Sequence, residues 1–210
     1  VSSEMCIRDR NSIKSGALVA QHLIGLGHVK IAYLTTPVSE RMLARSRRLQ
    51  GILDEYKRQG YADGVVVKAQ KTYCERSGMP LNAEYCAGYD LTRELLESGD
   101  TGVTAFVGLN DMVALGIMDA LIDAKFKIPQ DYSVVGCDNN LISGLRRVSL
   151  TTVEHYTTQK GRDAFEMLLN KMEHSGSRER EPAPQKIISL EYEPRLIVRG
   201  TTGPNRRRGK

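Results

Sequence analysis

Residues 104–121 read TAFVGLNDMVALGIMDAL, and they suggest one strand, one turn and one helix in succession. The first five residues are apolar or β-favouring, which predicts a short strand buried on both faces. From Asp111 onwards, apolar residues recur at helical spacing, so a helix should follow the polar pair Asn110-Asp111. This unit is the repeating module of a parallel sheet covered by helices.

The same alternation extends in both directions along the chain. Further strands are expected at residues 31–35, 64–69, 133–137, 149–153 and 186–193. Helices should end near Gly27, Gly60 and Gly99, and another carries Phe165, Leu168, Leu169 and Met172 at helical spacing. Apolar strands separated by amphipathic helices indicate an α/β protein with a doubly wound sheet, because strands buried on both sides cannot alternate apolar with polar residues.

Charge and cysteine content exclude several classes of protein. The 210-residue chain has a formal net charge of +5, but four positive charges lie in the tail Arg206–Lys210, so no basic nucleic-acid face is predicted. No run of about 18 apolar residues and no secretory leader occur, so we expect a cytoplasmic protein without a membrane span. Cys6, Cys74, Cys86 and Cys137 lack the paired spacing of structural zinc ligands.

Polar residues follow three of the predicted strands. They are Arg45, Arg47 and Arg48 after residues 31–35, Asn110 and Asp111 after residues 104–108, and Asp138, Asn139 and Asn140 after residues 133–137. In open α/β sheets, ligands bind beyond the carboxyl ends of the strands. A guanidinium, an amide and a carboxylate at one edge suit a polar, polyhydroxylated molecule such as a sugar. Alternatively, Asn110 and Asp111 only cap a helix, and Arg45 and Arg47 lie on a solvated helix face.

Catalytic motifs do not occur in the sequence. There is no nucleophile elbow, phosphate loop, dinucleotide fingerprint or zinc-protease motif. A nucleophilic Cys137 would need a base such as His155, and nothing in the local sequence supports that pairing. We therefore predict a protein that is not an enzyme and that holds neither a metal nor a cofactor.

Six sequence blocks together resemble the effector-binding domain of the lactose-repressor-like (LacI/GalR) family of bacterial transcription regulators. They are GALVAQHLIGLGHVKIAYLT, RLQG, FVGLNDMVALGIMDAL, IPQDYSVVGCDN, SLTTVEHYTTQKGRDAFEMLL and EPRLIVRGTT, in the order of the family. The resemblance implies a periplasmic-binding-protein-like fold of type I. In that fold two Rossmann-like parallel-sheet subdomains hold the effector between them, and the first of these is expected to be incomplete here.

The resemblance also implies a division of the chain. Residues 1–10 are unassigned and resemble a non-native leader, 11–28 are a remnant of the N-terminal subdomain, and 29–150 form the C-terminal subdomain. Residues 151–185 cross back to the N-terminal subdomain, 186–199 supply the last strand of the C-terminal subdomain, and 200–210 form a basic disordered tail. These boundaries are expectations taken from the family's pattern.

Three effector contacts carry over from the family, at Arg48, Asn110 and Asp138. His155 and Tyr85 are further candidate contacts; Tyr85 could replace an aromatic residue that the family often has where this chain has Ala83. Cys137 stands where the family commonly has tyrosine, so a packing or stacking contact should be lost there.

The function implied is sensing of a small effector, a sugar or a sugar derivative, by a homodimeric regulator. Operator DNA would be bound only through a helix-turn-helix head that is expected to precede this truncated chain. The alternative is a periplasmic-type sugar-binding protein of a transporter, for which Val1–Arg10 supplies no leader. A small α/β enzyme is a third, weaker interpretation.

Overall fold

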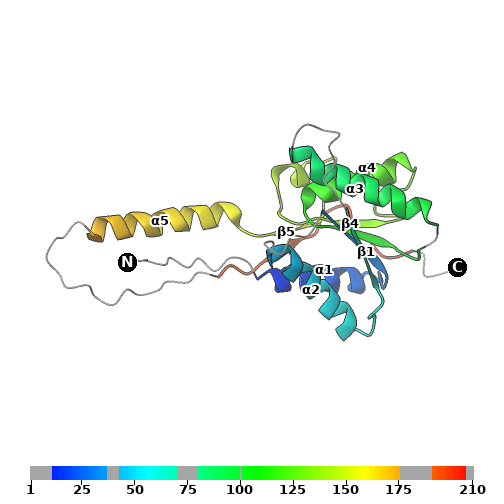
Figure 1. Cartoon of the computed structure of the whole chain (residues 1–210), viewed down its shortest axis with the longest axis horizontal. Coiled ribbons are helices and arrows are strands. Elements are labelled where there is room, and N and C mark those ends of the chain that lie inside the picture. Colours follow the sequence, from blue (N-terminus) through cyan, green and yellow to red (C-terminus); the bar gives the residue numbers. More distant parts are fainter. Residues whose placement is uncertain (1–10, 37–42, 71–79, 100, 176–190, 207–210) are drawn as a thin grey trace. The chain divides into compact units, whose positions relative to one another are not determined.

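The computed structural model describes residues 11–36, 43–70, 80–99, 101–175 and 191–206. The chain divides into two compact units (Figure 1). The sheet unit comprises Ser12–Glu154 and Arg195–Lys210, and the α5 unit comprises Val1–Asn11 and His155–Pro194. None of the helices in the described ranges combines the length and apolarity of a membrane span.

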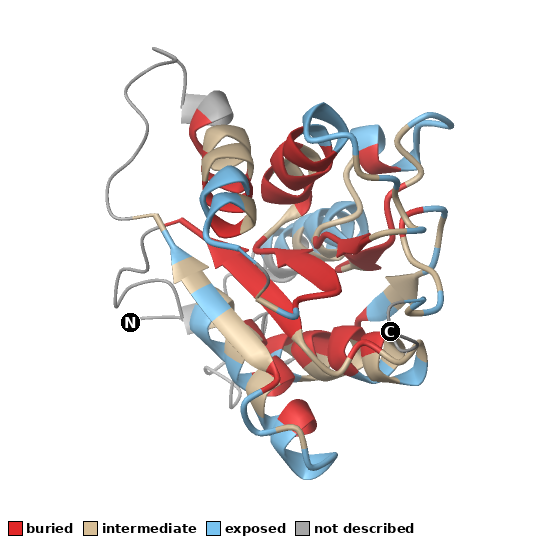
Figure 2. Ribbon diagram, turned by 90° about the vertical axis from the view of Figure 1, so that its right-hand side faces the viewer, coloured by how far each residue is buried: buried red, intermediate tan, exposed pale blue. Residues whose placement is uncertain are grey.

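Four parallel strands form the sheet of the sheet unit. They are β1 (Ile31–Thr35), β2 (Val65–Ala69), β3 (Ala105–Gly108) and β4 (Ser133–Val135), in the order β2-β1-β3-β4. Every residue of β1 and β3 is buried, whereas the edge strand β2 is partly exposed (Figure 2). The predicted α/β class and parallel sheet are confirmed, because continuous apolar runs became the central strands.

Two pairs of helices cover the two faces of this sheet (Figures 1 and 2). The helices are α1 (Ser12–Gly25), α2 (Leu43–Arg58), α3 (Pro80–Glu97) and α4 (Asp111–Asp123). In one pair α1 packs against α2, and in the other α3 packs against α4. Glycines permit the close approach: a Cβ on Gly16 of α1 would lie 2.0 Å from the Arg48 carbonyl oxygen, and one on Gly116 of α4 would lie 2.0 Å from that of Tyr85.

The strand order creates a switch point between β1 and β3. The connection after β1 runs through α2 to β2 on one side, and the connection after β3 runs through α4 to β4 on the other. The strands stay paired up to Leu34 and Gly108, but the two connections that follow them leave toward opposite faces, and ligands of open α/β sheets bind at such a point. We call this edge the carboxyl rim and define it by Arg48, Asn110 and Asp138.

Two short strands join the sheet unit to the α5 unit along the chain. They are β5 (Thr152–Glu154) and β6 (Arg195–Ile197), an antiparallel pair, and Thr151 also forms a bridge to Val135 of β4. The α5 unit contains α5 (Thr157–Ser175), on which Phe165 and Met172 are exposed. Within that unit the Tyr192 hydroxyl donates to Asp163, and Lys160 Nζ lies 5.4 Å from the Tyr192 ring centroid.

His28 lies at the amino ends of the strands, opposite the carboxyl rim, and links them to the C-terminal segment. Its Nδ1 lies 2.9 Å from Thr104 Oγ1, and its Nε2 lies 2.9 Å from both the Gly203 carbonyl oxygen and Ser133 Oγ. Nearby, Thr201 Oγ1 donates to the Val134 carbonyl over 2.7 Å. Part of the expected disordered tail is therefore ordered, because Thr201 pairs with Val134 of β4 and Gly203 contacts His28. Residues 207–210 lie outside the described residues.

Several predicted boundaries differ from the structure. Residues 11–28 were expected to belong with the N-terminal subdomain, but α1 packs on α2 and lies in the same unit as residues 29–150. The chain leaves this unit after Glu154 rather than after residue 150, and returns at Arg195 rather than at residue 186. Of the expected strand 186–193, residues 191–193 are not a strand and the rest lies outside the described residues; the strand present is β6.

Candidate functional site

Arg48 is the central side chain of the carboxyl rim. It lies on α2 with only 3% of its surface exposed, and its Nη1 donates to the Leu109 carbonyl oxygen directly after β3. Its Nη2 lies 3.9 Å from Asp138 Oδ1, after β4. Burial alone would lower the Arg48 pKa, but the neighbouring Cys137, Tyr33 and Asp138 groups outweigh it and raise this pKa. A fully charged guanidinium therefore spans the switch point of the sheet.

Asn110 has two roles in the structure. It is the N-cap of α4, where its side-chain oxygen accepts from Val113 N over 3.0 Å, so the predicted capping role is present. Its amide nitrogen Nδ2 also donates to Glu84 Oε2 over 2.5 Å. The side chain is thus held by α3 as well as α4, in an orientation fixed by both hydrogen bonds.

Glu84 is a rim residue that the sequence reasoning missed. Besides Asn110, it binds Arg45, whose Nη2 lies 2.8 Å from Glu84 Oε1. Arg45 Nη1 in turn donates to Thr36 Oγ1 over 3.0 Å. Arg45 is therefore part of the rim, whereas Arg47 is exposed on a solvated helix face. No local sequence signal marked Glu84, because it lies beyond the first turn of α3 and its partners are distant in the chain.

Asp138 is held in an unusual backbone conformation. Its φ is +117° and that of Asn139 is +47°, both in the region that favours glycine. Asp138 N donates to the Val153 carbonyl over 3.0 Å, which ties the turn to β5. The side chain of Asp138 is 43% exposed, so its carboxylate can accept hydrogen bonds from a ligand.

The neighbouring asparagines and Asp111 fix this turn. Asn139 accepts from Arg199 Nη2 and donates to Glu154 Oε2, each over 2.6 Å. Asn140 caps the short 3-10 helix Leu141–Gly144 through a 3.0 Å bond from Ser143 N. The buried Asp111 accepts from Asn140 N over 2.8 Å and from the Thr152 hydroxyl. Its pKa is raised by burial, although those hydrogen bonds oppose the shift.

The two further candidate effector contacts, Tyr85 and His155, are not among the residues that define the carboxyl rim. Tyr85 donates from its hydroxyl to Asp119 Oδ2 over 2.5 Å, on the surface between α3 and α4. Asp119 is nine residues beyond Asn110, roughly 13 Å along the axis of α4, so the structure does not bring Tyr85 to the rim. His155 is buried and is the first residue of the α5 unit.

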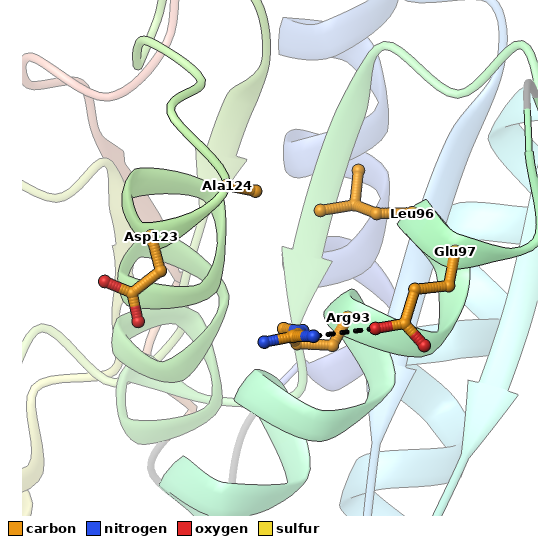
Figure 3. Close-up of a pocket in the computed structure, with 5 residues that line it drawn as sticks. All are labelled: Arg93, Leu96, Glu97, Asp123 and Ala124. Carbon is orange, nitrogen blue, oxygen red and sulfur yellow. Dashed lines mark hydrogen bonds and ion pairs between the residues drawn. The ribbon is translucent and has the colours of Figure 1, made fainter.

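A hollow of about 340 Å³ lies at the C-terminal ends of α3 and α4, at the other end of these helices from the carboxyl rim (Figure 3). It is lined by Arg93, Leu96, Glu97, Asp123 and Ala124. Arg93 pairs with Glu97 over 2.8 Å, and Asp123 accepts from the Tyr89 hydroxyl. Its charged groups are engaged with neighbouring residues, and it lies at the ends of α3 and α4 that are remote from Asn110 and the carboxyl rim.

Residues 20–202 match the family model described as a periplasmic binding protein-like domain. An arabinose metabolism transcriptional repressor of Halalkalibacterium halodurans is 27% identical over 91% of this chain and 48% of that protein. A ribose operon repressor of Escherichia coli is 31% identical over 77% of this chain and 45% of that protein. The chain thus spans about half the length of these curated relatives.

Solved structures share the fold. A LacI transcriptional regulator from a Rhodococcus species has a TM-score of 0.74 at 27% identity, covering 95% of this chain and 65% of that one. A LacI-family regulator from Enterococcus faecium, solved with bound ribose, has a TM-score of 0.74 at 23% identity, covering 97% and 68%; at that identity the likeness concerns the fold alone. The chain therefore belongs to the family of periplasmic binding protein-like domains, in the form that LacI-family regulators carry as their effector-binding part.

Proposed function

We propose that this chain is the effector-sensing part of a bacterial transcription regulator and that its effector is a carbohydrate. The observation that carries the proposal is the buried Arg48 guanidinium, which joins the strand end at Leu109 to the exposed carboxylate of Asp138. The relatives named as arabinose and ribose repressors support a sugar rather than another polar molecule. They also favour a regulator over the transporter protein that would share the fold.

The chemistry of the rim suits sugar hydroxyls. A hydroxyl both donates and accepts, so a charged donor and a charged acceptor side by side can bind adjacent hydroxyls of one ring. Arg48 supplies the donor, Asp138 the acceptor, and Asn110 an amide held by Glu84. His155, which directly follows β5, is proposed as a further contact from the α5 unit.

The wider regulatory role follows by the same reasoning. A sugar that binds one conformation of the effector-binding domain more tightly shifts the population toward it, and a homodimer would pass that change to DNA-binding heads. In this proposal the domain acts in the cytoplasm, performs no catalysis and contacts operator DNA only through a separate head domain.

Calorimetric titration of the chain with D-ribose, L-arabinose and a panel of hexoses tests the proposal. We expect one sugar to bind, and Asp138→Asn to weaken its binding at least tenfold, about 1.5 kcal/mol, because a charge-assisted hydrogen bond is lost. Asp63→Asn, which removes an exposed carboxylate near β2, is the matched control and should bind as wild type does.

The experiment tests the carbohydrate effector and its binding at the carboxyl rim separately. A wild-type chain that binds no sugar of the panel contradicts the carbohydrate effector. Equal affinities for wild type and Asp138→Asn would instead show that a sugar binds somewhere other than the carboxyl rim.

A further inference from the structure

The hydroxyl of Tyr33 is a buried polar group close to the rim. Tyr33 is the middle residue of β1, where it lies between Val67 of β2 and Val107 of β3, and only 1% of its surface is exposed. Among the described residues this hydroxyl has no hydrogen-bond partner. Buried tyrosine hydroxyls usually do find a partner, so one without a partner needs an explanation.

The groups around this hydroxyl are those of the candidate site. Burial raises the pKa of Tyr33 to about 12, the positive charges of Arg48 and Arg45 oppose that rise, and Cys137 adds to it. The phenol is therefore neutral at physiological pH and keeps its proton. It can donate one hydrogen bond and accept others, next to the guanidinium that spans the switch point.

Packing alone accounts for the ring of Tyr33 but not for its hydroxyl. The ring belongs to the core that joins the sheet to its covering helices. A phenylalanine would fill the same space without burying an oxygen that lacks a partner, which is costly in an apolar interior. A hydroxyl at this position suggests a hydrogen bond that forms in another state of the protein.

Arg48 is the neighbour able to provide that bond. A guanidinium carries five N–H donors in a rigid plane, and its two terminal nitrogens face Leu109 and Asp138 in the structure. A sugar that binds Asp138 competes for this face of the guanidinium. An acceptor that lies in the guanidinium plane, on the side away from the sugar, would then hold Arg48 in one orientation toward the sugar.

We propose that the Tyr33 hydroxyl accepts a hydrogen bond from Arg48 in the effector-bound state and so positions the guanidinium on the carbohydrate. Tyr33 acts through Arg48 and is a positioning residue for effector recognition. The inference rests on the proposed function, since it requires a carbohydrate at the rim.

Tyr56 offers a matched comparison within the same unit. It is also fully buried, but its hydroxyl donates to the His28 carbonyl oxygen over 2.7 Å. It lies on α2 eight residues after Arg48, about 12 Å along the helix axis and toward the other edge of the sheet. Removing the hydroxyl should therefore have opposite consequences at the two positions.

The experiment measures thermal unfolding without ligand, and calorimetric affinity for D-ribose, L-arabinose and the hexoses, in wild type, Tyr33→Phe and Tyr56→Phe. For Tyr33→Phe we expect an unchanged or higher Tm and a roughly tenfold weaker affinity for the sugar that wild type binds. For Tyr56→Phe we expect a lower Tm and an unchanged affinity.

Each contrary result has its own meaning. A Tyr33→Phe variant that binds the sugar as wild type does overturns the inference and leaves the proposed function standing. A Tm that falls as far as that of Tyr56→Phe also overturns it, because the hydroxyl would then be bonded in the free protein. Absence of any sugar binding by wild type contradicts the proposed function and the inference together.

Discussion

Asn139 occupies a backbone conformation that glycine adopts at lower cost, yet its side chain has two strong partners. With φ at +47° it carries strain, while its amide bridges Arg199 and Glu154 over 2.6 Å on each side. Hydrogen bonds to charged groups contribute about 1.5–3 kcal/mol each, whereas a left-handed residue costs about 1–2 kcal/mol. The hydrogen bonds therefore outweigh the strain, and they hold the turn that presents Asp138.

We accordingly expect Asn139→Gly to lower the free energy of unfolding by about 2 kcal/mol, although the backbone conformation suits glycine. Urea unfolding followed by circular dichroism measures the change. Lys125 gives the control, because it has φ of +66° and an exposed side chain. Lys125→Gly should be neutral or stabilising by up to about 1 kcal/mol. If Asn139→Gly is as stable as wild type, the bridge does not hold this turn.

The role of a single residue could be predicted from the sequence only where nearby residues in the chain determine that role. The meeting of strand ends at one edge of a sheet pointed to a set of polar residues, and the family resemblance selected Arg48, Asn110 and Asp138 among them. Glu84 could not be found this way, since its role arises from a contact between α3 and the start of α4. Tyr33 was hidden inside an apolar run, where its hydroxyl changes neither the strand pattern nor its burial.

The helix pairs depend on backbone contact rather than on interlocking side chains. Gly16 of α1 lies directly against the Arg48 carbonyl, and Gly51 of α2 lies against that of Ile13. The spacing of α1 and α2 is therefore set by two glycines, one on each helix. Because one contact is the backbone of Arg48 itself, the same packing places the guanidinium.

Gly16→Ala tests this dependence. Its Cβ would lie 2.0 Å from a backbone oxygen that cannot rotate away, so α1 and α2 must separate. We expect a loss of at least about 2–3 kcal/mol in the free energy of unfolding, together with weaker sugar binding.

Gly25→Ala is the control for that variant, because nothing lies within 4 Å of its Cβ at the end of the same helix. It should be neutral or slightly stabilising, as alanine is the better helix former. Chemical denaturation of both variants compares them. Equal stability of Gly16→Ala and wild type would mean that the helix pair can loosen without cost.

The sequence predicted a strand well where burial alone determines it. It predicted a strand poorly where pairing with a distant segment of the chain determines it. Strand β1 matches its predicted bounds because a wholly apolar run in the middle of a sheet has few alternatives. Strand β6 was missed because residues 195–197 become extended through antiparallel pairing with β5. That pairing depends on segments about forty residues apart in the chain, which no local pattern reveals.

At the scale of the whole molecule, the C-terminal segment completes the sheet unit. Residues 200–206 were expected to be disordered because they carry no apolar period, but Thr201 pairs with Val134 of β4 by backbone and side chain. His28 continues this connection through Gly203, Thr104 and Ser133. One buried imidazole thus links the residue before β3, the first residue of β4 and the C-terminal segment.

This arrangement makes the stability of the sheet unit depend on pH. Burial holds the pKa of His28 below its ordinary value of 6.5, and the charge of His22 lowers it further. The unfolded chain therefore takes up a proton at higher pH than the folded chain does. The stability contributed by neutral His28 is present above pH 6.5 and is lost as the pH falls toward the folded-state pKa.

We expect the free energy of unfolding to fall between pH 7.5 and 5.5, with a slope of up to about 1.4 kcal/mol per pH unit for each proton taken up. Carboxylates such as Glu55, whose pKa Arg58 lowers to about 2, change their charge below this window. His22 is half-buried with a lowered pKa, so it contributes to the same slope.

Urea unfolding at several pH values separates the contributions of the two histidines. His28→Gln should be less stable than wild type at pH 7.5 but show a flatter dependence of stability on pH. His22→Gln should keep most of the wild-type slope. A wild-type stability that stays constant from pH 7.5 to 5.5 would show that His28 can be protonated without breaking its bonds to Thr104, Ser133 and Gly203.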